Sequence, residues 1–384
     1  MKAHYDAAII GGGITGMMTA HKLLQKGAEN VVVFEEKWMG SGQSNRNSGG
    51  IRAQFGNVET IRLMTESLKE WRGLTHELDY NILFHQAGYL FLVLQDEDMA
   101  EYDAQRAVQN SNGIDTRWLG IDEVAELVPG IRKSVLAGGN FHALDGTAHH
   151  DAVLNALRFS VARQGGELYE HAPVTNLSFD GDGRGLLTTP SGSVSADFVV
   201  LAAAARSPDI AAMAGVRLPV TPYRRELLAT EPVRHFLSPM IVSLKFGMTM
   251  HQTLRGELVG NTRVAEPESF DTKGSLPFLV QFAKDDAYLM PFMKYVRVVR
   301  QWAGTYDMTP DGSPVISPAP GIPSFVIAAG SSGHGFMMAP EVGKLVAEYI
   351  TTGKVPEIMR PFSIERFERG ELLREPSVTG KKID

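Results

Sequence analysis

Residues 5–16 read YDAAIIGGGITG, a short apolar run that ends in closely spaced glycines. The run has the character of a buried parallel strand, and residues 14–26 carry apolar side chains at helical spacing up to Gly27. A second apolar run, VVVF at 31–34, follows this helix. The stretch therefore predicts a strand–helix–strand unit of an α/β fold.

The glycines between the first strand and the helix match the G-x-G-x-x-G dinucleotide fingerprint. Its residues are Gly11, Gly13, Ile14, Thr15 and Gly16. Gly11 permits the tight turn, Gly13 lets the backbone approach a pyrophosphate, and Gly16 allows close helix–strand packing, while the helix N-terminus attracts the anion. Glu35, followed by Glu36, stands nineteen residues past Gly16, where a carboxylate can accept from ribose hydroxyls. A glycine triplet alone would be a weak signal, but strand, helix and acid together predict NAD or FAD.

Composition excludes several classes of protein. The 384 residues include 37 basic and 44 acidic side chains, 39 glycines and no cysteine. The net charge of −7 disfavours a protein held on nucleic acid by its phosphates. Without cysteine the chain has no disulfide, thiolate nucleophile or Cys-ligated metal. The sequence also contains no H-E-x-x-H motif, so no other metal site is predicted. Glycine and proline interrupt the N-terminal apolar run and the charge-free stretch 313–340, so we expect a cytoplasmic protein without a membrane span.

The length predicts two or three domains. Apolar runs at 198–203 and 325–329 are similar to the first strand, which indicates one sheet assembled from distant pieces of the chain. Strands of an antiparallel sheet are expected at 88–94, 134–142, 226–230, 241–244, 256–260, 278–282 and 286–290. Helices are expected at 58–79, 96–110 and 151–164, and the tail 376–384 is expected to be loosely held.

A second loop rich in glycine and serine occupies residues 40–52, GSGQSNRNSGGIR. It is either a flexible surface loop or backbone laid along an extended cofactor, which requires small side chains. The predicted cofactor contacts in it are Ser44, Asn47, Ser48 and Gly49. Arg52 closes the loop, either as a solvated surface residue or as a planar, bidentate clamp for an amino-acid carboxylate.

Together these motifs resemble the D-amino-acid-oxidase-like flavoproteins. The resemblance covers residues 5–370 and rests on the fingerprint, GGIRAQF at 49–55, WAGTYDMTPDG at 302–312 and VIAAGSSGHGFMMAPEVGKLVAEYI at 326–350. Within that family the sequence is most similar to the β-subunits of sarcosine oxidase and of dye-linked L-proline dehydrogenase. The resemblance implies one FAD per chain and a substrate domain built on an antiparallel sheet over the flavin.

The predicted fold class is therefore α/β, a Rossmann-like FAD-binding domain interleaved with an antiparallel-sheet α+β substrate domain. We expect the FAD-binding domain to comprise 1–85, 145–215 and 305–384, and the substrate domain to comprise 86–144 and 216–304. Val174 and Ala203 are further predicted FAD contacts. Because the chain has no cysteine, no cysteinyl link can form, and noncovalent FAD is expected.

The segment 331–337 leads into a helix expected over 338–350. A glycine-flanked helix start that faces a flavin would stabilise negative charge on the reduced ring. The predicted contacts here are Gly333, His334, Gly335, Phe336 and Met337. His334 is either a general base or a residue that positions loop or cofactor atoms. Tyr306 stands where the resemblance implies a carboxylate-binding arginine in glycine oxidases, so it either binds a substrate carboxylate or lies in the core.

Two positions bear on the fate of the electrons. The resemblance implies a lysine at the position of Met337 in oxygen-using sarcosine oxidases, where it assists electron transfer to oxygen. Methionine there favours a dehydrogenase with an external electron acceptor. The stretch GTAHHDAVLNAL resembles the segment of heterotetrameric sarcosine oxidases whose histidine, matched by His150, carries covalent FMN at a subunit interface. The alternative is that His150 only begins the helix at 151–164.

The sequence thus predicts an enzyme that oxidises the C–N bond of a small amino acid or secondary amine, proline- or sarcosine-like, by hydride transfer to flavin N5. The alternatives are a partner-dependent flavoprotein subunit of such a complex, an oxidase of the same substrates, and an enzyme for 2-hydroxy acids. A partner subunit or a homo-oligomer is compatible with each of them, and FMN is expected only in a hetero-oligomer.

Overall fold

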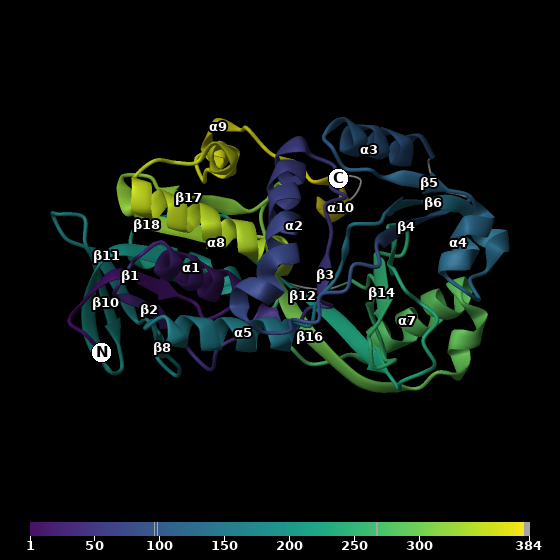
Figure 1. Cartoon of the computed structure of the whole chain (residues 1–384), viewed down its shortest axis with the longest axis horizontal. Coiled ribbons are helices and arrows are strands. Elements are labelled where there is room, and N and C mark those ends of the chain that lie inside the picture. Colours follow the sequence, from purple (N-terminus) through teal and green to yellow (C-terminus); the bar gives the residue numbers. More distant parts are fainter. Residues whose placement is uncertain (96, 98, 266–267, 380–384) are drawn as a thin grey trace.

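The computed structural model of the chain describes residues 1–95, 97, 99–265 and 268–379, in which two eight-stranded sheets lie side by side (Figure 1). The first sheet has the order β17, β18, β11, β1, β2 and β8, with β10 and β9 attached beside β11. Its strands are β1 (His4–Ile10), β2 (Val31–Phe34), β8 (Glu167–Tyr169), β9 (Asn176–Phe179), β10 (Gly185–Thr189), β11 (Gly192–Leu201), β17 (Val315–Ala319) and β18 (Ile322–Ala329). From β18 to β8 the strands are parallel, so distant parts of the chain do form one sheet, as the sequence predicts.

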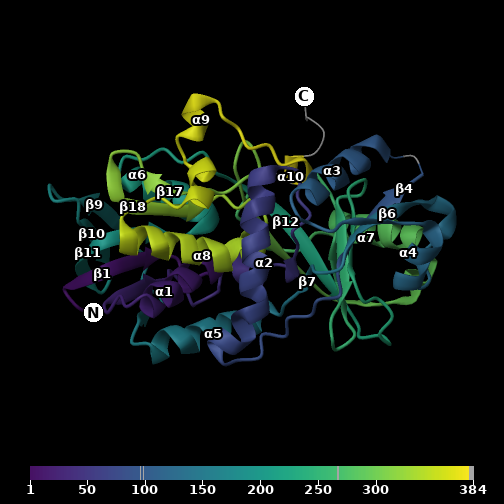
Figure 2. The ribbon, with the colours of Figure 1, turned by 45° about the horizontal axis from the view of Figure 1, so that its top comes forward.

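Three helices cover one face of this sheet, and a fourth crosses them (Figure 2). They are α1 (Ile14–Gln25), α5 (His150–Arg163), α8 (Gly335–Thr352) and, packed across α8, α2 (Val58–Leu78). Because side chains alternate along a strand, Ile9 and Val33 pack toward these helices, whereas Ala8 and Val32 pack on the opposite face. The opposite face is covered by α6 (Ser207–Met213) and by β9 and β10.

The second sheet has the order β16, β12, β15, β14, β13, β4, β6 and β5. Its strands are β4 (Tyr89–Leu94), β5 (Arg117–Leu119), β6 (Leu136–His142), β12 (Thr221–Thr230), β13 (Met240–Ser243), β14 (Met248–Gln252), β15 (Leu258–Asn261) and β16 (Val298–Met308). All neighbours are antiparallel except β13 and β4. One face packs on α4 (Ile121–Leu127) and α7 (Leu276–Leu289), while α3 (Met99–Ser111) lies near β5 and β6 (Figure 1). The α/β class with two interleaved sheets is thus confirmed.

The predicted strands at 278–282 and 286–290 are wrong, because residues 278–282 and 286–289 lie in α7 and Met290 is its C-cap. Ser275 caps this helix by accepting a hydrogen bond from the Phe278 amide, and Pro277 stands in its first turn. The buried residues Phe278, Phe282 and Leu289 recur at helical rather than strand spacing. The helix expected over 338–350 begins three residues earlier, at Gly335, because its first turn closes on the 331–334 loop.

The predicted helices at 58–79 and 151–164 are confirmed as α2 and α5 within one residue at each end. Residues 96 and 98 of the helix expected at 96–110 lie outside the described residues, and α3 covers most of the remainder. The predicted tail is described only as far as residue 379, where Pro376–Thr379 form the short helix α10. Short elements complete the chain: β3 (Gly50–Ile51) pairs with β7 (Gly146–Thr147), α9 spans Arg366–Arg369, and 3₁₀ turns occur at Gln43–Asn45, Lys133–Val135, Ala204–Arg206, Pro291–Tyr295 and Glu357–Phe362.

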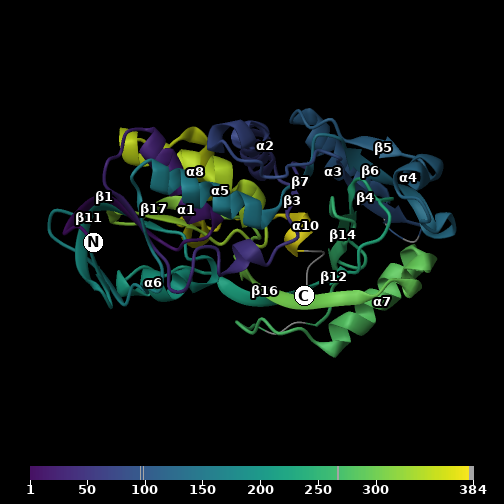
Figure 3. The ribbon, with the colours of Figure 1, turned by 60° about the horizontal axis from the view of Figure 1, so that its bottom comes forward.

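The long edge strand β16 carries the chain from one sheet toward the other (Figure 3). It passes through the predicted domain boundary at residue 305, so a strand of the second sheet delivers Tyr306 to the start of α8. The exact bounds of the two domains stay a prediction. Within the described ranges, no helix combines the length and the apolar character needed to cross a bilayer.

Helix α7 contains a buried carboxyl group whose charge should weaken the fold. One side-chain oxygen of Asp286 has no hydrogen-bond partner, and burial, then the neighbouring Asp285, raises the pKa of Asp286 from 3.8 to about 8. The native state therefore holds this proton more tightly than the unfolded chain, so stability falls as pH rises from about 4 to about 8. We expect Asp286→Asn to raise Tm at pH 8 by about 2–4 °C and to have little effect at pH 4. Thermal unfolding at both pH values measures the effect.

Asp285→Asn is the matched control for this change. Asp285 accepts hydrogen bonds from Thr262 and Gln281, so its replacement should lower Tm. An Asp286→Asn variant that is less stable than the wild type at pH 8 would show that the carboxylate is stabilised by its surroundings.

Candidate active site

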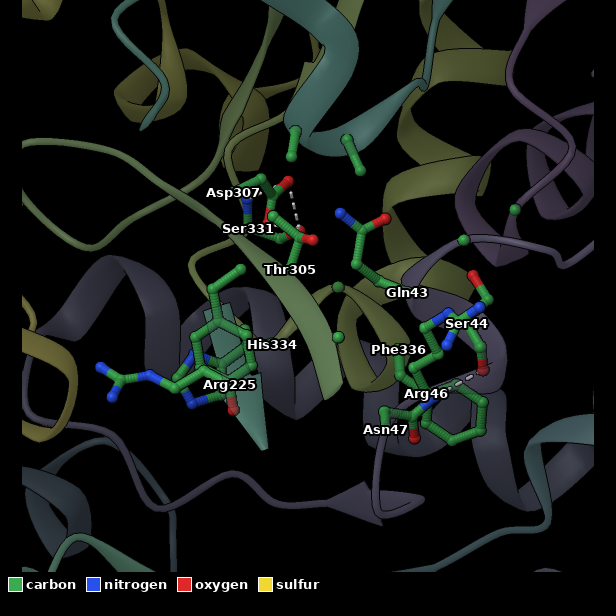
Figure 4. Close-up of a pocket in the computed structure, with 18 of the residues that line it drawn as sticks. Gln43, Ser44, Arg46, Asn47, Arg225, Thr305, Asp307, Ser331, His334 and Phe336 are labelled. Atoms are coloured by element: carbon green, nitrogen blue, oxygen red, sulfur yellow. Dashed lines mark hydrogen bonds between the residues drawn. The ribbon is translucent and has the colours of Figure 1, made fainter. Parts of the chain in front are cut away.

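A cavity of about 660 Å³ lies where the loops of the first sheet meet the exposed face of the second. Figure 4 shows side chains that line it: Gln43, Ser44 and Asn47 of the 40–52 loop lie on one side, and Arg225 and Thr305 of the second sheet lie across from them. Its volume falls within the range of small-molecule and cofactor sites. We therefore take this cavity as the candidate active site.

Two of the fingerprint glycines, Gly11 and Gly16, stand where a side chain would collide with backbone. Gly11 has φ +113°, and a Cβ there would lie 2.4 Å from the Ala202 carbonyl oxygen at the end of β11. A Cβ on Gly16 would lie 2.0 Å from the Gly11 carbonyl oxygen. The backbone of β1, α1 and the β11 loop therefore meets at contact distance, and Gly11, Gly13 and Ile14 line the cavity.

The carboxylate of Glu35 is engaged within the fingerprint itself. It accepts hydrogen bonds from the amide of Gly12 (2.9 Å), the amide of Lys37 (3.1 Å) and the hydroxyl of Ser41 (3.0 Å). A carboxylate offers about four acceptor positions, so one remains for a ribose hydroxyl. Glu35 and the exposed Glu36 both line the cavity, and their role toward a ribose stays a prediction.

The second glycine-rich loop is fixed by its own polar groups. Ser44 accepts from the amide of Ile14 (2.9 Å), so this loop closes over the N-terminus of α1. Asn47 donates to the Ser44 carbonyl and accepts from the Gly49 amide, both at 2.6 Å. Gly49 has φ +77° and faces the Ala148 carbonyl. These bonds favour the prediction of a built cofactor wall over that of a flexible surface loop.

The start of α8 presents backbone to the cavity. Ser331 donates its amide and hydroxyl to Asp307, whose carboxylate lies beside it in Figure 4. The ring of Tyr306 packs against Gly333, where a Cβ would lie 2.2 Å from a ring carbon. The Met337 carbonyl accepts from Ser67 (2.6 Å) and from the indole of Trp71 (2.8 Å). The helix N-terminus is therefore held rigidly at the cavity, as a site for a polar or anionic group requires.

Arg52 is a buried cation, with 5% of its surface exposed. It stacks on Phe55 at 3.9 Å and donates to the Gln54 carbonyl, to His334 Nε2 (3.1 Å) and to Ser377 Oγ (2.9 Å). Among the described residues no carboxylate lies within ion-pair distance of Arg52. Burying such a charge without an ion pair is costly, and this burial excludes the solvated surface residue, while the carboxylate clamp stays a prediction.

His334 stands at the N-cap position of α8, beside Arg52, and its side chain makes no capping hydrogen bond. Arginine can only donate, so His334 Nε2 accepts and the neutral ring carries its hydrogen on Nδ1. Burial, then the Arg52 charge, holds the pKa of His334 well below its ordinary value. Because the free lone pair of the ring is engaged by Arg52, these contacts favour the positioning role of His334 over that of a general base.

The wall opposite α8 comes from the second sheet and was missed by the sequence analysis. Tyr89, Phe91, Met240 and Val242 form a separate apolar cluster on the cavity side of β4 and β13. The runs that contain these residues are apolar throughout, so no alternation marked which side chains face the site. The half-buried Arg225 of β12 lies 5.6 Å from the Tyr306 ring and was also missed.

Most of the predicted site residues lie around this one cavity. Those that line it are Gly11, Gly13, Ile14, Thr15, Glu35, Glu36, Ser44, Asn47, Ser48, Arg52, Val174, Ala203, Tyr306, Gly333, His334, Gly335, Phe336 and Met337. Gly16 and Gly49 do not line it but pack backbone behind it, and His150 lies apart from it. The individual contacts of these residues with a cofactor or substrate stay predictions.

His150 belongs to a second group of histidines, at the N-terminus of α5. Its ring stacks on His149 at 5.3 Å, and burial lowers the pKa of His150 to about 4. His251 on β14 is buried nearby; burial and these two histidines lower its pKa to about 4, and its Nδ1 has no partner. Within the described ranges, no cluster of histidine and carboxylate groups is arranged to hold a metal ion.

The geometry of the cavity fits an FAD. The volume, the close backbone approach at Gly11 and Gly16 and the held N-terminus of α8 suit a long, anionic and partly planar group. The residues that would hold it are those of the fingerprint, the 41–48 loop and the 331–337 segment.

Comparison with known proteins points the same way. Residues 6–349 match the family described as FAD dependent oxidoreductase. The chain is 30% identical to the sarcosine oxidase subunit beta of an Arthrobacter species over 97% of its length and 94% of that protein. It is 26% identical to the glycine oxidase of Geobacillus kaustophilus over 95% of its length and 98% of that protein.

Among solved structures, the fold is similar to that of the L-proline dehydrogenase from P. horikoshii. The TM-score is 0.92 at 32% identity, covering 97% of this chain and all of that one. The resemblance stated from the motifs is thereby confirmed. The protein is an enzyme and belongs to the FAD-dependent oxidoreductase family.

Proposed function

We propose that this enzyme oxidises the C–N bond of a small amino acid or secondary amine that carries a carboxylate, proline- or sarcosine-like, and that it works as a dehydrogenase with noncovalent FAD. The observation that carries the proposal is Arg52, a buried cation with no ion-paired carboxylate among the described residues, in the cavity beside the start of α8. The names of the relatives support the class, since they act on sarcosine, glycine or L-proline.

The chain itself does the work of orientation. Arg52 would bind the substrate carboxylate, and the wall formed by Tyr89, Phe91 and Met240 would hold the apolar part of the substrate and exclude water. FAD, when bound, supplies the acceptor for the hydride that leaves the carbon beside nitrogen as C–N becomes C=N.

The amine must react as the neutral species, since its lone pair forms the C=N bond. His334 Nε2 accepts from Arg52, so this nitrogen has no lone pair for the ammonium proton, which must pass to solvent before the hydride leaves. The remaining amine proton then leaves to solvent.

The experiment that tests this function uses the holoenzyme reconstituted with FAD. Anaerobic addition of L-proline, D-proline, sarcosine, glycine and a 2-hydroxy acid should bleach the flavin only with the amino-acid class. Turnover in air should reduce an artificial dye without matching peroxide production, in line with Met337. Rapid peroxide formation would instead show an oxidase, and failure of the whole panel to bleach the flavin would refute the proposal.

A second candidate function is that of a flavoprotein subunit which also carries FMN at His150. It is favoured by one observation: His149 and His150 at the start of α5 lie close to His251 on β14, whose buried Nδ1 has no partner. The sarcosine oxidase subunit beta relatives support a partner chain by their name.

For this second candidate we expect a flavin that stays with the polypeptide after acid precipitation and remains on one peptide that contains His150. The His150→Asn variant should lose this flavin but keep FAD, whereas His149→Asn is the matched control and should retain both. Release of FAD alone from the wild-type complex would contradict the idea. Mass spectrometry of the peptide makes the measurement.

A further inference from the structure

The C-terminal segment reaches across the chain to the candidate clamp. Helix α10 lies beside one end of α2 in Figures 1 and 2. Just before it, Glu375 is buried and accepts from the amides of Gly56 (3.0 Å) and Asn57 (3.2 Å) and from the Asn57 side chain (2.9 Å). The Glu375 amide donates to the Asp311 carbonyl at 3.0 Å. Residues 375–377 are therefore anchored, so the part of the tail expected to be loosely held that begins at 376 is tied down at Ser377.

Ser377 connects this anchor to Arg52. Its hydroxyl donates to Glu375 at 2.6 Å and accepts from Arg52 Nη2 at 2.9 Å, and Ser377 lines the cavity. Glu375 is also the carboxylate that most strongly favours the charge of Arg52, although the two do not form an ion pair. The Ser377 hydroxyl thus joins the Glu375 carboxylate to the buried Arg52 guanidinium through two hydrogen bonds.

The N–H donors of Arg52 show how the contact with Ser377 orients the guanidinium. One terminal nitrogen serves the Gln54 carbonyl, and the other is shared between His334 and Ser377. Ser377 and His334 therefore fix the plane of the guanidinium, which leaves Nε and the second hydrogen of Nη1 as the donors that a substrate carboxylate can use.

We propose that Ser377 is a positioning residue, supplied by the C-terminal segment, that holds Arg52 in the orientation which binds a substrate carboxylate. The inference rests on the proposed function only for the identity of the substrate, because binding of any small carboxylate reports on the clamp. Substrate specificity in this site then depends on the last described turn of the chain.

Gly56, which lies against Pro376, allows the position of the C-terminal segment to be changed without altering Ser377. A Cβ on Gly56 would lie 2.7 Å from Pro376 Cδ and 3.0 Å from Pro376 Cγ, and Gly56 is not among the positive-φ glycines. Gly56→Ala should therefore displace the segment without touching Arg52 and without backbone strain of its own.

The test uses the full chain loaded with FAD and titrated with cyclopentanecarboxylate, a proline analogue that cannot be oxidised at nitrogen. Its Kd is read from the perturbed flavin absorbance. We expect Ser377→Ala to weaken binding about tenfold and Ser377→Thr, which keeps the hydroxyl, to restore most of it. With an oxidisable substrate, KM should rise by a similar factor while kcat changes less than about threefold.

Ser111→Ala, which removes an exposed hydroxyl on α3, is the matched control and should leave both constants unchanged. Gly56→Ala should weaken carboxylate binding in the same direction, which keeps the test decisive if Ser377→Ala does not fold. Unchanged Kd in Ser377→Ala, or no carboxylate binding by the wild type, would overturn the inference. Ser377-dependent carboxylate binding without flavin bleaching by any amine would instead sustain the inference and refute the proposed function.

Discussion

Replacing Arg52 by methionine should lower kcat/KM for an amino-acid substrate by about 10²–10³-fold, or roughly 3–4 kcal/mol of transition-state stabilisation. The reason is that Arg52 is the buried cation through which the cavity would bind a carboxylate. Steady-state kinetics and anaerobic flavin reduction measure the loss. Arg52→Lys keeps the charge but loses the planar fork, so it should recover only part of the activity.

Stability separates this role from a structural one. Because the described residues give Arg52 no ion pair, its burial costs free energy in the ligand-free protein. The change also removes the hydrogen bonds of Arg52 to Gln54, His334 and Ser377, so the two effects oppose each other. Arg52→Met should therefore keep FAD and show a Tm within about 3 °C of that of the wild type. Lower Tm together with loss of FAD would mean that Arg52 supports the fold, and unchanged kcat/KM would remove it from the substrate site.

The parts of the site that the sequence predicts are those where backbone must come close to something. Gly11 and Gly16 leave a mark in the sequence because only glycine avoids the collisions found there. Gly49 and Gly333 have positive φ, and a Cβ added there would lie 2.3 Å from the Ala148 carbonyl oxygen and 2.2 Å from the Tyr306 ring. Glycine spacing therefore predicted three loops that line the cavity.

Other parts depend on contacts that sequence patterns do not record. Tyr89 and Met240 face the cavity from apolar strands whose buried faces look alike in sequence. Ser377 meets Arg52 across 325 residues, and nothing near either residue announces the pairing. Helix α7 was mistaken for strands because short apolar runs fit both structures, although its cap at Ser275 and its buried residues follow a helical pattern.

Gly11→Ala should weaken FAD binding at least tenfold, because the new methyl group would sit 2.4 Å from the backbone oxygen of Ala202 at a φ of +113°. The Ala202 oxygen is a backbone atom that cannot move aside like a side chain, so β1 and the β11 loop must separate where the protein backbone would approach the cofactor. Gly27→Ala is the matched control: its φ is +93°, but nothing lies within 4 Å of the added carbon. It carries a similar left-handed penalty of about 1–2 kcal/mol and should keep full FAD content at a lower Tm. The flavin-to-protein absorbance ratio after dialysis compares the two, and equal ratios would mean that close backbone approach at Gly11 does not govern FAD binding.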